Sequence, residues 1–424
     1  MPGMFRQPGG RGNRGVGAPA LRRTAAVGET AAFVVGPPEA RVPDIRRPLE
    51  GLVVLDLSRV LAGPYTTQML GDLGAEVWKV ERPGLGDETR AWGPPFVGDN
   101  SAYYLSVNRN KRSAALDFGN AEDLATIKRA AMAADVVVEN FLPGALVPYG
   151  LDHASLRRMK PELVVCSITG FGQDGPYAQL PGYDAVLQGF TGLMSITGEK
   201  DGPPIKVGVA LMDVLAGVHA GAAILAALVG RLRGGGGSHL DVALFEVGVH
   251  AMVNQSQAAL STGQPARRQG NAHPHIVPYQ TFAAADGLIV IAIGNDEQFR
   301  RLCAALGDPA RADDPRFTRN PARILHREEV VRWLTETLAH EPRDVWLERL
   351  RAARVPAGAV RDLHEVMADP ALVERGMVAD AVVPGATSRL MAIPWRIEGF
   401  RPPLRLPPPS LGEHTARFRE RFAG

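Results

Sequence analysis

The segment KVGVALMDVLAGVHAGAAILAALVGRLR, residues 206–233, predicts a helix that is buried on nearly all sides. Between Asp213 and Arg231, His219 is the only residue with a charge or a polar ring. A carboxylate that is buried without a partner costs several kcal/mol. Asp213 is therefore expected to be paired, to lie at the start of the helix, or to take part in chemistry.

Two interpretations of Asp213 follow from this position. Aspartate is a preferred N-cap, because its side-chain oxygen accepts the free N–H groups of the first helical turn. The same N–H groups would keep the carboxylate ionised, and an ionised carboxylate can attack an activated acyl group. Gly217 and Gly221 clear one face of the helix, either for tight packing against another helix or for a thin ligand.

The flanks of this helix favour a soluble protein. The run GGGG at residues 234–237 is typical of a helix stop and turn, and not of a phosphate-binding loop. The apolar part is rich in Ala and Gly and falls short of the ~20 residues that span a bilayer. It therefore predicts a core helix and no membrane partner.

Upstream, apolar runs alternate with helical stretches. LVVLDL at 52–57 is apolar on both faces, as in a buried parallel strand, and Gly63 and Pro64 then suit a turn and a helix start. Further strands are predicted at 76–81, 113–117, 136–139 and 162–168, and helices at 66–73, 121–133 and 152–160. Repeated βα units predict an α/β fold with a Rossmann-like, doubly wound parallel sheet that binds ligands at the carboxyl ends of its strands.

The turn after the first strand does not favour a dinucleotide or ATP site. SRVLAGP has one glycine where GxGxxG requires three, and GxxxxGK[ST] does not occur. Cations do gather in this half, since Arg82 ends the second strand and NRNKR at 108–112 precedes the third. They predict either a run of solvated charges or a positively charged site at the sheet edge that binds a phosphorylated ligand.

The second half has a different organisation. Asp184 is predicted to be the N-cap of a helix over 185–193, and another helix covers 244–262. Asp286-Gly287 between apolar runs predicts a hairpin, which helices at 296–306, 327–339 and 342–354 extend into a smaller α+β domain. His273 and His275 form only an HxH pair, so no metal site is predicted.

The predicted domain order has five parts. They are a disordered leader over 1–48, a large Rossmann-like domain over 49–240, a linker helix and loop over 241–277, a small α+β domain over 278–365, and a C-terminal segment over 366–424 that returns to the large domain. Cys166 and Cys303 are the only cysteines, which excludes a disulfide scaffold and favours a reducing compartment.

The leader carries most of the charge asymmetry. It has eight Arg and three acidic residues, which gives a local charge of +5. Because the formal net charge of the whole chain is +2, the remaining residues carry a net charge of −3. A basic nucleic-acid surface on the folded body is therefore not expected. We expect a cytoplasmic protein; a mitochondrial one is the alternative if residues 1–48 are a transit peptide, although their Gly and Pro do not suit an amphipathic helix.

Several motifs occur in the order found in one enzyme family. LDLSRVLAGPYTTQMLGDLGAEVWKVERPGLGDETR, ADVVVENFLPG, SITGFGQDGPY, PGYDAVLQGFTGL, the Asp213 segment and PPSLGEHT resemble the class III CoA-transferase (CaiB/BaiF) family, which includes formyl-CoA and carnitine CoA-transferases. The resemblance covers Leu49 to Thr415. WGPPFVG, AYYLSVNRNK and GNAHPHIVPYQ further resemble the branch of succinyl-CoA:glutarate and hydroxymethylglutarate CoA-transferases.

The resemblance implies a fold, a reaction and a set of site residues. It implies an interlocked homodimer that takes CoA thioesters as substrates and keeps no permanently bound cofactor. Asp213 would attack the donor, succinyl-CoA, to give an aspartyl anhydride and then an aspartyl-CoA thioester, before CoA passes to a carboxylic and probably dicarboxylic acid. The family's CoA contacts fall on Leu61, Ala62, Arg82, Leu116, Asn140 and Phe141.

Two departures from the family pattern affect the site. Pro148 stands where the family often has an Arg, so Lys111 or Arg112 is predicted to supply that phosphate contact. RRQGNAHPH replaces the glycine-rich flap of the formyl-type enzymes, so another loop would have to protect the anhydride. The second carboxylate of a dicarboxylic substrate needs a cation, for which Arg59, Arg90 and Arg109 are candidates.

Two alternatives remain open. The 2-methylacyl-CoA racemases of the family use a His immediately before the Asp of a GYD-like segment, where this chain has Tyr183. A phenol with a pKa of ~10 is a poor substitute for an imidazole with a pKa of ~6.5 in proton exchange, which favours the transferase. The alternative from another class is a catalytically silent CoA-binding protein.

Overall fold

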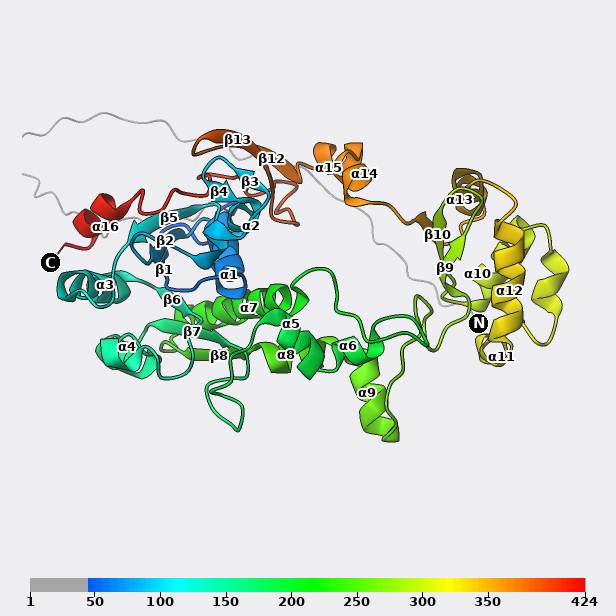
Figure 1. Cartoon of the computed structure of the whole chain (residues 1–424), viewed down its shortest axis with the longest axis horizontal. Helices are drawn as coiled ribbons and strands as arrows, with labels where there is room; N and C mark the ends of the chain where they lie inside the picture. The colour runs from blue at the N-terminus through cyan, green and yellow to red at the C-terminus, as the bar shows by residue number, and fades with distance from the viewer. Residues whose placement is uncertain (1–44, 424) are drawn as a thin grey trace, which may run out of the picture. The chain divides into compact units, whose positions relative to one another are not determined.

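A six-stranded parallel sheet organises the residues described by the computed structural model, 45–423 (Figure 1). The leader predicted for 1–48 lies almost entirely outside them. The strand order is β5-β2-β1-β6-β7-β8, which is the 3-2-1-4-5-6 order of a doubly wound sheet. The predicted fold class is thus confirmed. The strands are β1 (Val53–Asp56), β2 (Glu76–Glu81), β5 (Lys111–Ala115), β6 (Val136–Glu139), β7 (Val164–Thr169) and β8 (His239–Ala243).

Helices cover both faces of this sheet, because alternate side chains of each buried strand point to opposite faces. On one face, Val54, Val138 and Cys166 belong to a core with helices that include α1 (Ala62–Asp72), α5 (Asp184–Phe190), α7 (Leu211–Leu232) and α8 (Leu244–Ala251). On the other face, Leu55 and Val137 share a core with α3 (Ala121–Ala133), α4 (His153–Met159) and α16 (Thr415–Arg421).

The strand order reverses direction between β1 and β6, which are hydrogen-bonded neighbours. From β1 the chain continues to β2 on one side, and from β6 it continues to β7 on the other. The loops that follow β1 and β6 therefore diverge at the carboxyl edge of the sheet. Such a switch point leaves a crevice, which is where doubly wound folds bind ligands.

Helix α7 is buried on one side only, in contrast to the prediction. Met212, Ala216, Ala220 and Ile224 face the core, while Val218 is 42% and Val229 is 53% exposed. The helix has 22 residues, so the prediction that it is too short to cross a membrane was also wrong. By length and composition it is the one candidate span among residues 45–423, although its inner face packs in the protein core.

Other elements differ locally from the prediction. Helix α1 begins at Ala62 and not near Thr66, so Gly63 lies inside its first turn. A glycine is needed at that position because a Cβ there would lie 2.3 Å from Cβ of Ser58. The predicted helix over 244–262 is two helices, α8 and α9 (Val253–Thr262), broken where Val253 takes a positive φ of 38°. Strand β8 was not predicted at all.

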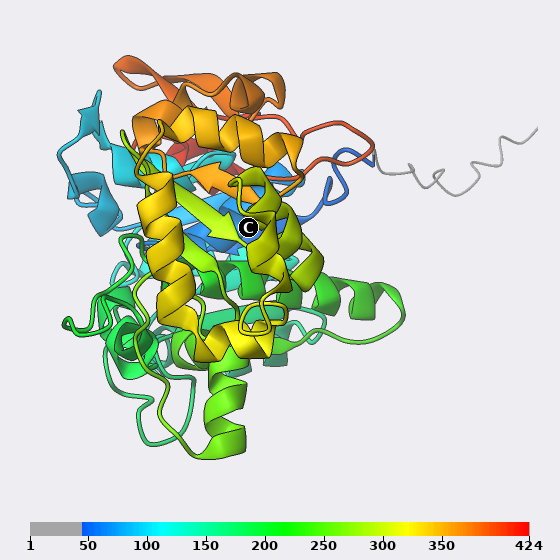
Figure 2. The ribbon, with the colours of Figure 1, turned by 90° about the vertical axis from the view of Figure 1, so that its right-hand side faces the viewer.

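A second, three-stranded sheet has its own core (Figure 2, green to orange). Strands β9 (Tyr279–Ala283) and β10 (Leu288–Ala292) form an antiparallel hairpin around the predicted Asp286-Gly287 turn, and β11 (Ala357–Ala359) pairs with β10. The surrounding helices are α10 (Asp296–Ala305), α11 (Asn320–Leu325), α12 (Arg327–Leu338) and α13 (Arg343–Ala352). The predicted domain boundaries as such stay a prediction.

The C-terminal part of the chain contacts the first third. The hairpin of β12 (Val378–Val383) and β13 (Ala386–Met391) shares a small core with Leu105, which lies in α2 (Ala102–Val107). Further on, Gly412 N donates to Ser113 Oγ at 2.9 Å. Phe418 and Phe422 pack edge-on against Trp78 of β2. Short helices α6 (Leu193–Ile196), α14 (Leu363–Met367) and α15 (Pro370–Glu374), strands β3 (Phe96–Val97) and β4 (Asn100–Ser101), and 3₁₀ turns at Glu88–Ala91, Val147–Tyr149 and Pro309–Asp313 complete the structure.

Candidate active site

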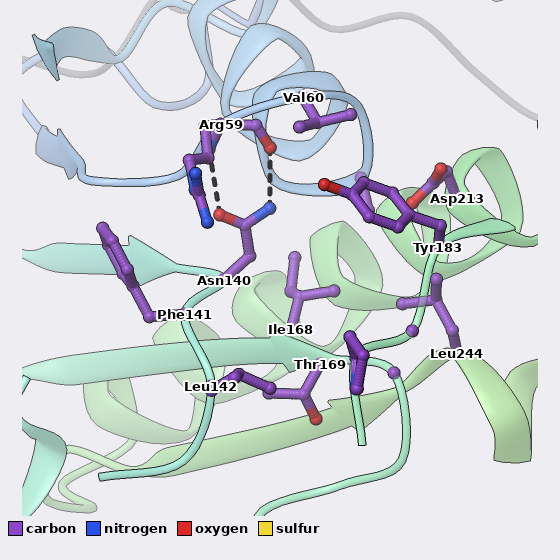
Figure 3. A pocket seen from close by; sticks show the side chains of 14 residues that line it. Arg59, Val60, Asn140, Phe141, Leu142, Ile168, Thr169, Tyr183, Asp213 and Leu244 are labelled. Atoms are coloured by element: carbon purple, nitrogen blue, oxygen red, sulfur yellow. Dashed lines mark hydrogen bonds between the residues drawn. The ribbon is translucent and has the colours of Figure 1, made fainter. Parts of the chain in front are cut away.

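A cavity of about 190 Å³ opens at the switch point of the sheet (Figure 3). Asp213 lines it from α7, Val60 from the loop before α1, and Asn140 from the loop after β6. Ala62 lines it as the first residue of α1. Tyr183 lines it from the residue before α5. The other lining residues are Arg59, Phe141, Leu142, Ile168, Thr169, Gly170, Pro181, Gly182 and Leu244.

The carboxylate of Asp213 makes no hydrogen bond or ion pair with any residue in the range 45–423. Helix α7 begins at Leu211, so Asp213 is its third residue and the N-cap interpretation is wrong. The side chain that accepts from the first turn of α7 is instead that of Asp184, whose Oδ1 accepts a hydrogen bond of 2.7 Å from Met212 N. Asp213 is therefore left free to face the cavity.

Asp184 also differs from its predicted role. The N-cap of α5 is Tyr183, and Asp184 is the first residue of that helix. Its second oxygen accepts a hydrogen bond of 2.6 Å from Gln188 Nε2, which also donates to Val209 O. Asp184 thus joins the starts of α5 and α7 and places its negative charge near Asp213.

The surroundings of Asp213 oppose its ionisation. Burial, together with the charge of Asp184, raises the pKa of Asp213 to about 7. Burial and the charges of Asp213 and Asp184 also raise the pKa of Tyr103 to about 12. A weakly solvated carboxylate without hydrogen bonds is a stronger nucleophile than one in water.

A second cavity of about 560 Å³ lies beside the first and shares Arg59 and Phe141 with it. Its wall comes from the carboxyl ends of β1, β2 and β5 and includes Arg82, Leu116 and Phe118. Arg82 is exposed, and its guanidinium has no hydrogen bond or ion pair within residues 45–423. The two cavities together suit an elongated ligand with one end at Asp213 and an anionic group near Arg82.

The loop between β1 and α1 forms the wall between these cavities. Asn140 Oδ1 accepts from Arg59 N at 2.9 Å, and Asn140 Nδ2 donates to Arg59 O at 2.6 Å. Val60 follows with a φ of 69°, a conformation that costs a β-branched residue roughly 1–3 kcal/mol. The Arg59 guanidinium contacts Glu88 and lies 5.5 Å from the centre of the Phe141 ring.

The basic run at 108–112 forms neither a solvated charge run nor a positively charged ligand site, because Arg109 and Lys111 are buried. Lys111 is fully buried and donates to Asp56, Pro64 O and Asn108, and burial lowers its pKa to about 8 against the opposing effect of Asp56. Arg112 is 3.7 Å from Glu76 and stacks over Trp78. Both lie at the amino end of β5, because they begin that strand, and neither lines the two cavities. The prediction that one of them replaces the missing arginine contact finds no support.

The structure brings most of the other predicted site residues together. Asp213, Ala62, Asn140 and Phe141 line the smaller cavity, and Arg82, Leu116 and Phe141 line the larger one. Leu61 is the buried N-cap residue of α1 between Val60 and Ala62. Their roles stay predictions. Among residues 45–423, no group of three His, Cys, Asp or Glu is placed to hold a metal ion.

Sequence reasoning missed two features of the site. The role of Asp87 next to Val60 left no local signal, since the two lie 27 residues apart. Gly170 and Gly182 line the cavity where two segments touch, and a Cβ on Gly170 would be 2.7 Å from Gly182 Cα. The glycines of SITGFG and PGYD were the available signal for this close approach.

Comparison with known proteins assigns the family. The sequence model of CoA-transferase family III matches residues 49–415. The chain belongs to this family. It is 46% identical over 391 residues to a succinate–glutarate CoA-transferase of Agrobacterium fabrum, which covers 89% of this chain and 96% of that protein. It is 41% identical over 405 residues to the human succinyl-CoA:glutarate CoA-transferase, which covers 94% and 92%.

Solved structures of the family agree with this fold. A CaiB/BaiF family protein from Brucella suis superposes with a TM-score of 0.80 at 43% identity, covering 89% of this chain and all of that one. The protein Rv3272 from Mycobacterium tuberculosis gives a TM-score of 0.78 at 30% identity, with 89% and 100% covered. The family III CoA-transferase described here is therefore an enzyme that transfers CoA between acyl groups.

Proposed function

We propose that this enzyme transfers CoA from succinyl-CoA to a dicarboxylic acid, with Asp213 as the nucleophile. The observation that carries the proposal is the carboxylate of Asp213, which faces a cavity and has no partner among the described residues. A structural carboxylate in such a place would be paired or capped. The names of the relatives from Agrobacterium fabrum and human supply the proposed donor and acceptor class.

The reaction would proceed through two covalent intermediates on Asp213. An oxygen of Asp213 attacks the thioester carbonyl of the donor, the C–S bond breaks, and an acyl-aspartyl anhydride and CoA thiolate result. The thiolate attacks the aspartyl carbonyl, which releases the donor acid and leaves an aspartyl-CoA thioester. An acceptor carboxylate then reverses these two steps and regenerates Asp213. The thioester energy is retained as long as water is excluded.

One of the three candidate arginines remains for the second carboxylate of the substrate. Arg90 is committed to Glu81, Asn100 and Tyr104, and the buried Arg109 to Asp72. Arg59 lines both cavities and is exposed. We assign Arg59 to this contact, for which it would exchange Glu88 for the substrate. Arg59→Gln should raise KM for dicarboxylic acceptors and leave KM for monocarboxylic acceptors unchanged; an equal effect on both would refute the assignment.

The role of Asp213 is tested by substitution. Asp213→Ala should lower CoA exchange between succinyl-CoA and glutarate by at least roughly a thousandfold, because the covalent route is lost. CoA binding, measured by calorimetry, should persist. The control is Asp201→Ala, an exposed carboxylate that lines neither cavity. Near-normal turnover of Asp213→Ala would exclude Asp213 as the nucleophile.

The same assays separate the alternatives. A racemase would incorporate deuterium at C2 of a 2-methylacyl-CoA without any acceptor acid, and a silent CoA-binding protein would bind CoA without exchanging acyl groups. Sequencing the N-terminus of the mature protein distinguishes a cytoplasmic from a mitochondrial location.

We also propose that the enzyme works as a homodimer. The outer face of α7 supports this, since Val218 and Val229 are exposed there and Leu232 is 85% exposed. Such an apolar stripe is typical of an interface between copies of a chain. Light scattering should give the mass of two chains, and Val218→Glu with Val229→Glu should reduce it to one. Leu325→Glu, at an exposed residue far along the chain in α11, is the control.

A further inference from the structure

Val60 is the strained point in the wall between the two cavities. Its φ of 69° is rare for a β-branched residue. Val60 lines the cavity that contains Asp213, whereas its neighbour Ser58 lines the larger one. Because such conformations persist only when their surroundings hold them, the contacts of this loop should reveal what maintains it.

Three side chains bind the two peptide groups that join Ser58, Arg59 and Val60. Lys79 Nζ donates to Ser58 O at 2.7 Å, and Asn140 bonds both N and O of Arg59. Both oxygens of Asp87 lie 3.2 Å from Val60 N. Of these contacts, the one from Asp87 acts on the strained residue itself.

Asp87 is itself fixed from several sides. Its carboxylate is 2.9 Å from the ammonium group of Lys79, and both side chains are buried. It also accepts hydrogen bonds from N and Oγ1 of Thr89, and its own N–H donates to Glu81 Oε2. Lys79 and Glu81 belong to β2, so the sheet supplies a rigid mount for the carboxylate.

We propose that Asp87 is a positioning residue for CoA transfer, which holds Val60 in the left-handed conformation and so fixes the wall along which the CoA thioester lies. The inference rests on the proposed function, because the wall matters to turnover only if the two cavities receive the thioester. Asp87 acts through Val60 and the loop, and not on the reacting atoms.

A set of substitutions at two positions tests this role. Glycine adopts a positive φ without strain, whereas alanine retains the strain although it also lacks the valine methyl groups. Asp87→Asn is therefore combined with Val60, Val60→Ala and Val60→Gly, and kcat and KM for succinyl-CoA are measured in each background. Circular dichroism checks that every variant is folded.

The proposal predicts how the loss depends on the background. Asp87→Asn should lower kcat/KM roughly tenfold with Val60 or Val60→Ala, mainly through KM for succinyl-CoA, and less than about threefold with Val60→Gly. Equal losses in all three backgrounds would overturn the proposal. If Asp87→Asn does not fold, Asp87→Glu keeps the charge beside Lys79 while moving the oxygens from Val60 N, and the same comparison applies.

The outcome is separable from that of the proposed function. If Asp213→Ala abolishes exchange while the Asp87 loss is the same in every background, the inference fails and the function stands. If Asp213→Ala remains active, the proposed function fails, whatever the effect of Asp87.

Discussion

Asp213 combines a free carboxylate with surroundings that disfavour its charge. It faces a cavity, lacks hydrogen bonds within the described residues, and has a second carboxylate, Asp184, nearby. Asp184 accepts the hydrogen bond from Met212 N that an N-cap aspartate of α7 would have accepted. A residue from another helix thus binds the free N–H group at the start of α7. The ionised carboxylate of Asp213 is more reactive because no hydrogen bond from residues 45–423 stabilises its charge.

The raised pKa of Asp213 predicts a pH dependence of activity. Only the ionised carboxylate attacks the thioester, so kcat/KM for succinyl-CoA should fall as the pH decreases through about 7. Asp184→Asn keeps an oxygen for Met212 N but removes the charge, so the acid limb should move to lower pH. The shift should be partial, because burial is the larger cause. An unmoved or higher acid limb in kinetic profiles of this variant would contradict the assignment.

The same residue should cost the protein stability. Asp213 has a pKa of about 7 in the folded chain and 3.8 without the fold, so protonation stabilises the folded state. That stabilisation is complete below pH 3.8 and is lost as the pH rises through 7. Asp213→Asn cannot ionise and should melt roughly 2–4 °C higher than the wild type at pH 8, with a smaller gain at pH 5. Calorimetry at both pH values checks this; a gain that is larger at pH 5 would have the wrong sign.

The sequence predicted the positions and roles of some site residues but not of others. Asp213 stood out because it is a charge in an apolar run, which is a local signal. Lys111 was misplaced, because residues that begin a parallel strand lie at the opposite edge from Arg82, which follows one. The strain at Val60 and its bond to Asp87 depend on backbone dihedrals and a long-range contact, neither of which residue type encodes.

At the scale of elements, the packing of α1 on α7 depends on glycine. A Cβ on Gly217 would lie 2.9 Å from Ala62 O and 3.1 Å from the ring of Tyr65, and Thr66 Oγ1 donates to Gly217 O at 3.0 Å. The tight-packing interpretation of Gly217 is therefore correct. Because Ala62 and Asp213 line the same cavity from these two helices, their spacing also sets the width of the site.

Two alanine substitutions in α7 should have opposite effects. Gly217→Ala should lower the free energy of unfolding by roughly 1–3 kcal/mol, because α1 must move. Gly230→Ala, where a Cβ meets nothing within 4 Å, should raise it by about 0.5–1 kcal/mol through helix propensity. Urea titration measures both. Equal effects of the two substitutions would show that the spacing of the helices is not constrained at Gly217.

Elements with a strong pattern were predictable and the others were not. Strands β1, β2 and β6 are short, mostly apolar runs rich in valine, and they lie where expected. β8 contains His239 and Asp241, which a partly exposed edge strand tolerates, so its pattern is weak. The break between α8 and α9 occurs at Met252 and Val253, which carry no helix-breaking signal.

At the scale of the whole molecule, the C-terminal helix completes the first core. Phe418 is fully buried against Trp78. Phe418→Ala should lower the free energy of unfolding by about 3–5 kcal/mol, as expected for a buried aromatic residue. Leu325→Ala, at a side chain that is 84% exposed, is the control and should change it by less than about 0.5 kcal/mol. Denaturant unfolding of both variants checks the difference; a loss below about 1 kcal/mol for Phe418→Ala would mean that α16 adds little.

The position of α16 has a consequence for biosynthesis. The six sheet strands have all been synthesised once residue 243 is made, but the aromatic cover of Trp78 is among the last segments to be translated. During most of synthesis the nascent chain must therefore expose one uncovered patch of its sheet. A chaperone that binds apolar surfaces would find its target there, and a premature stop codon near the end of the message would leave that target permanently open.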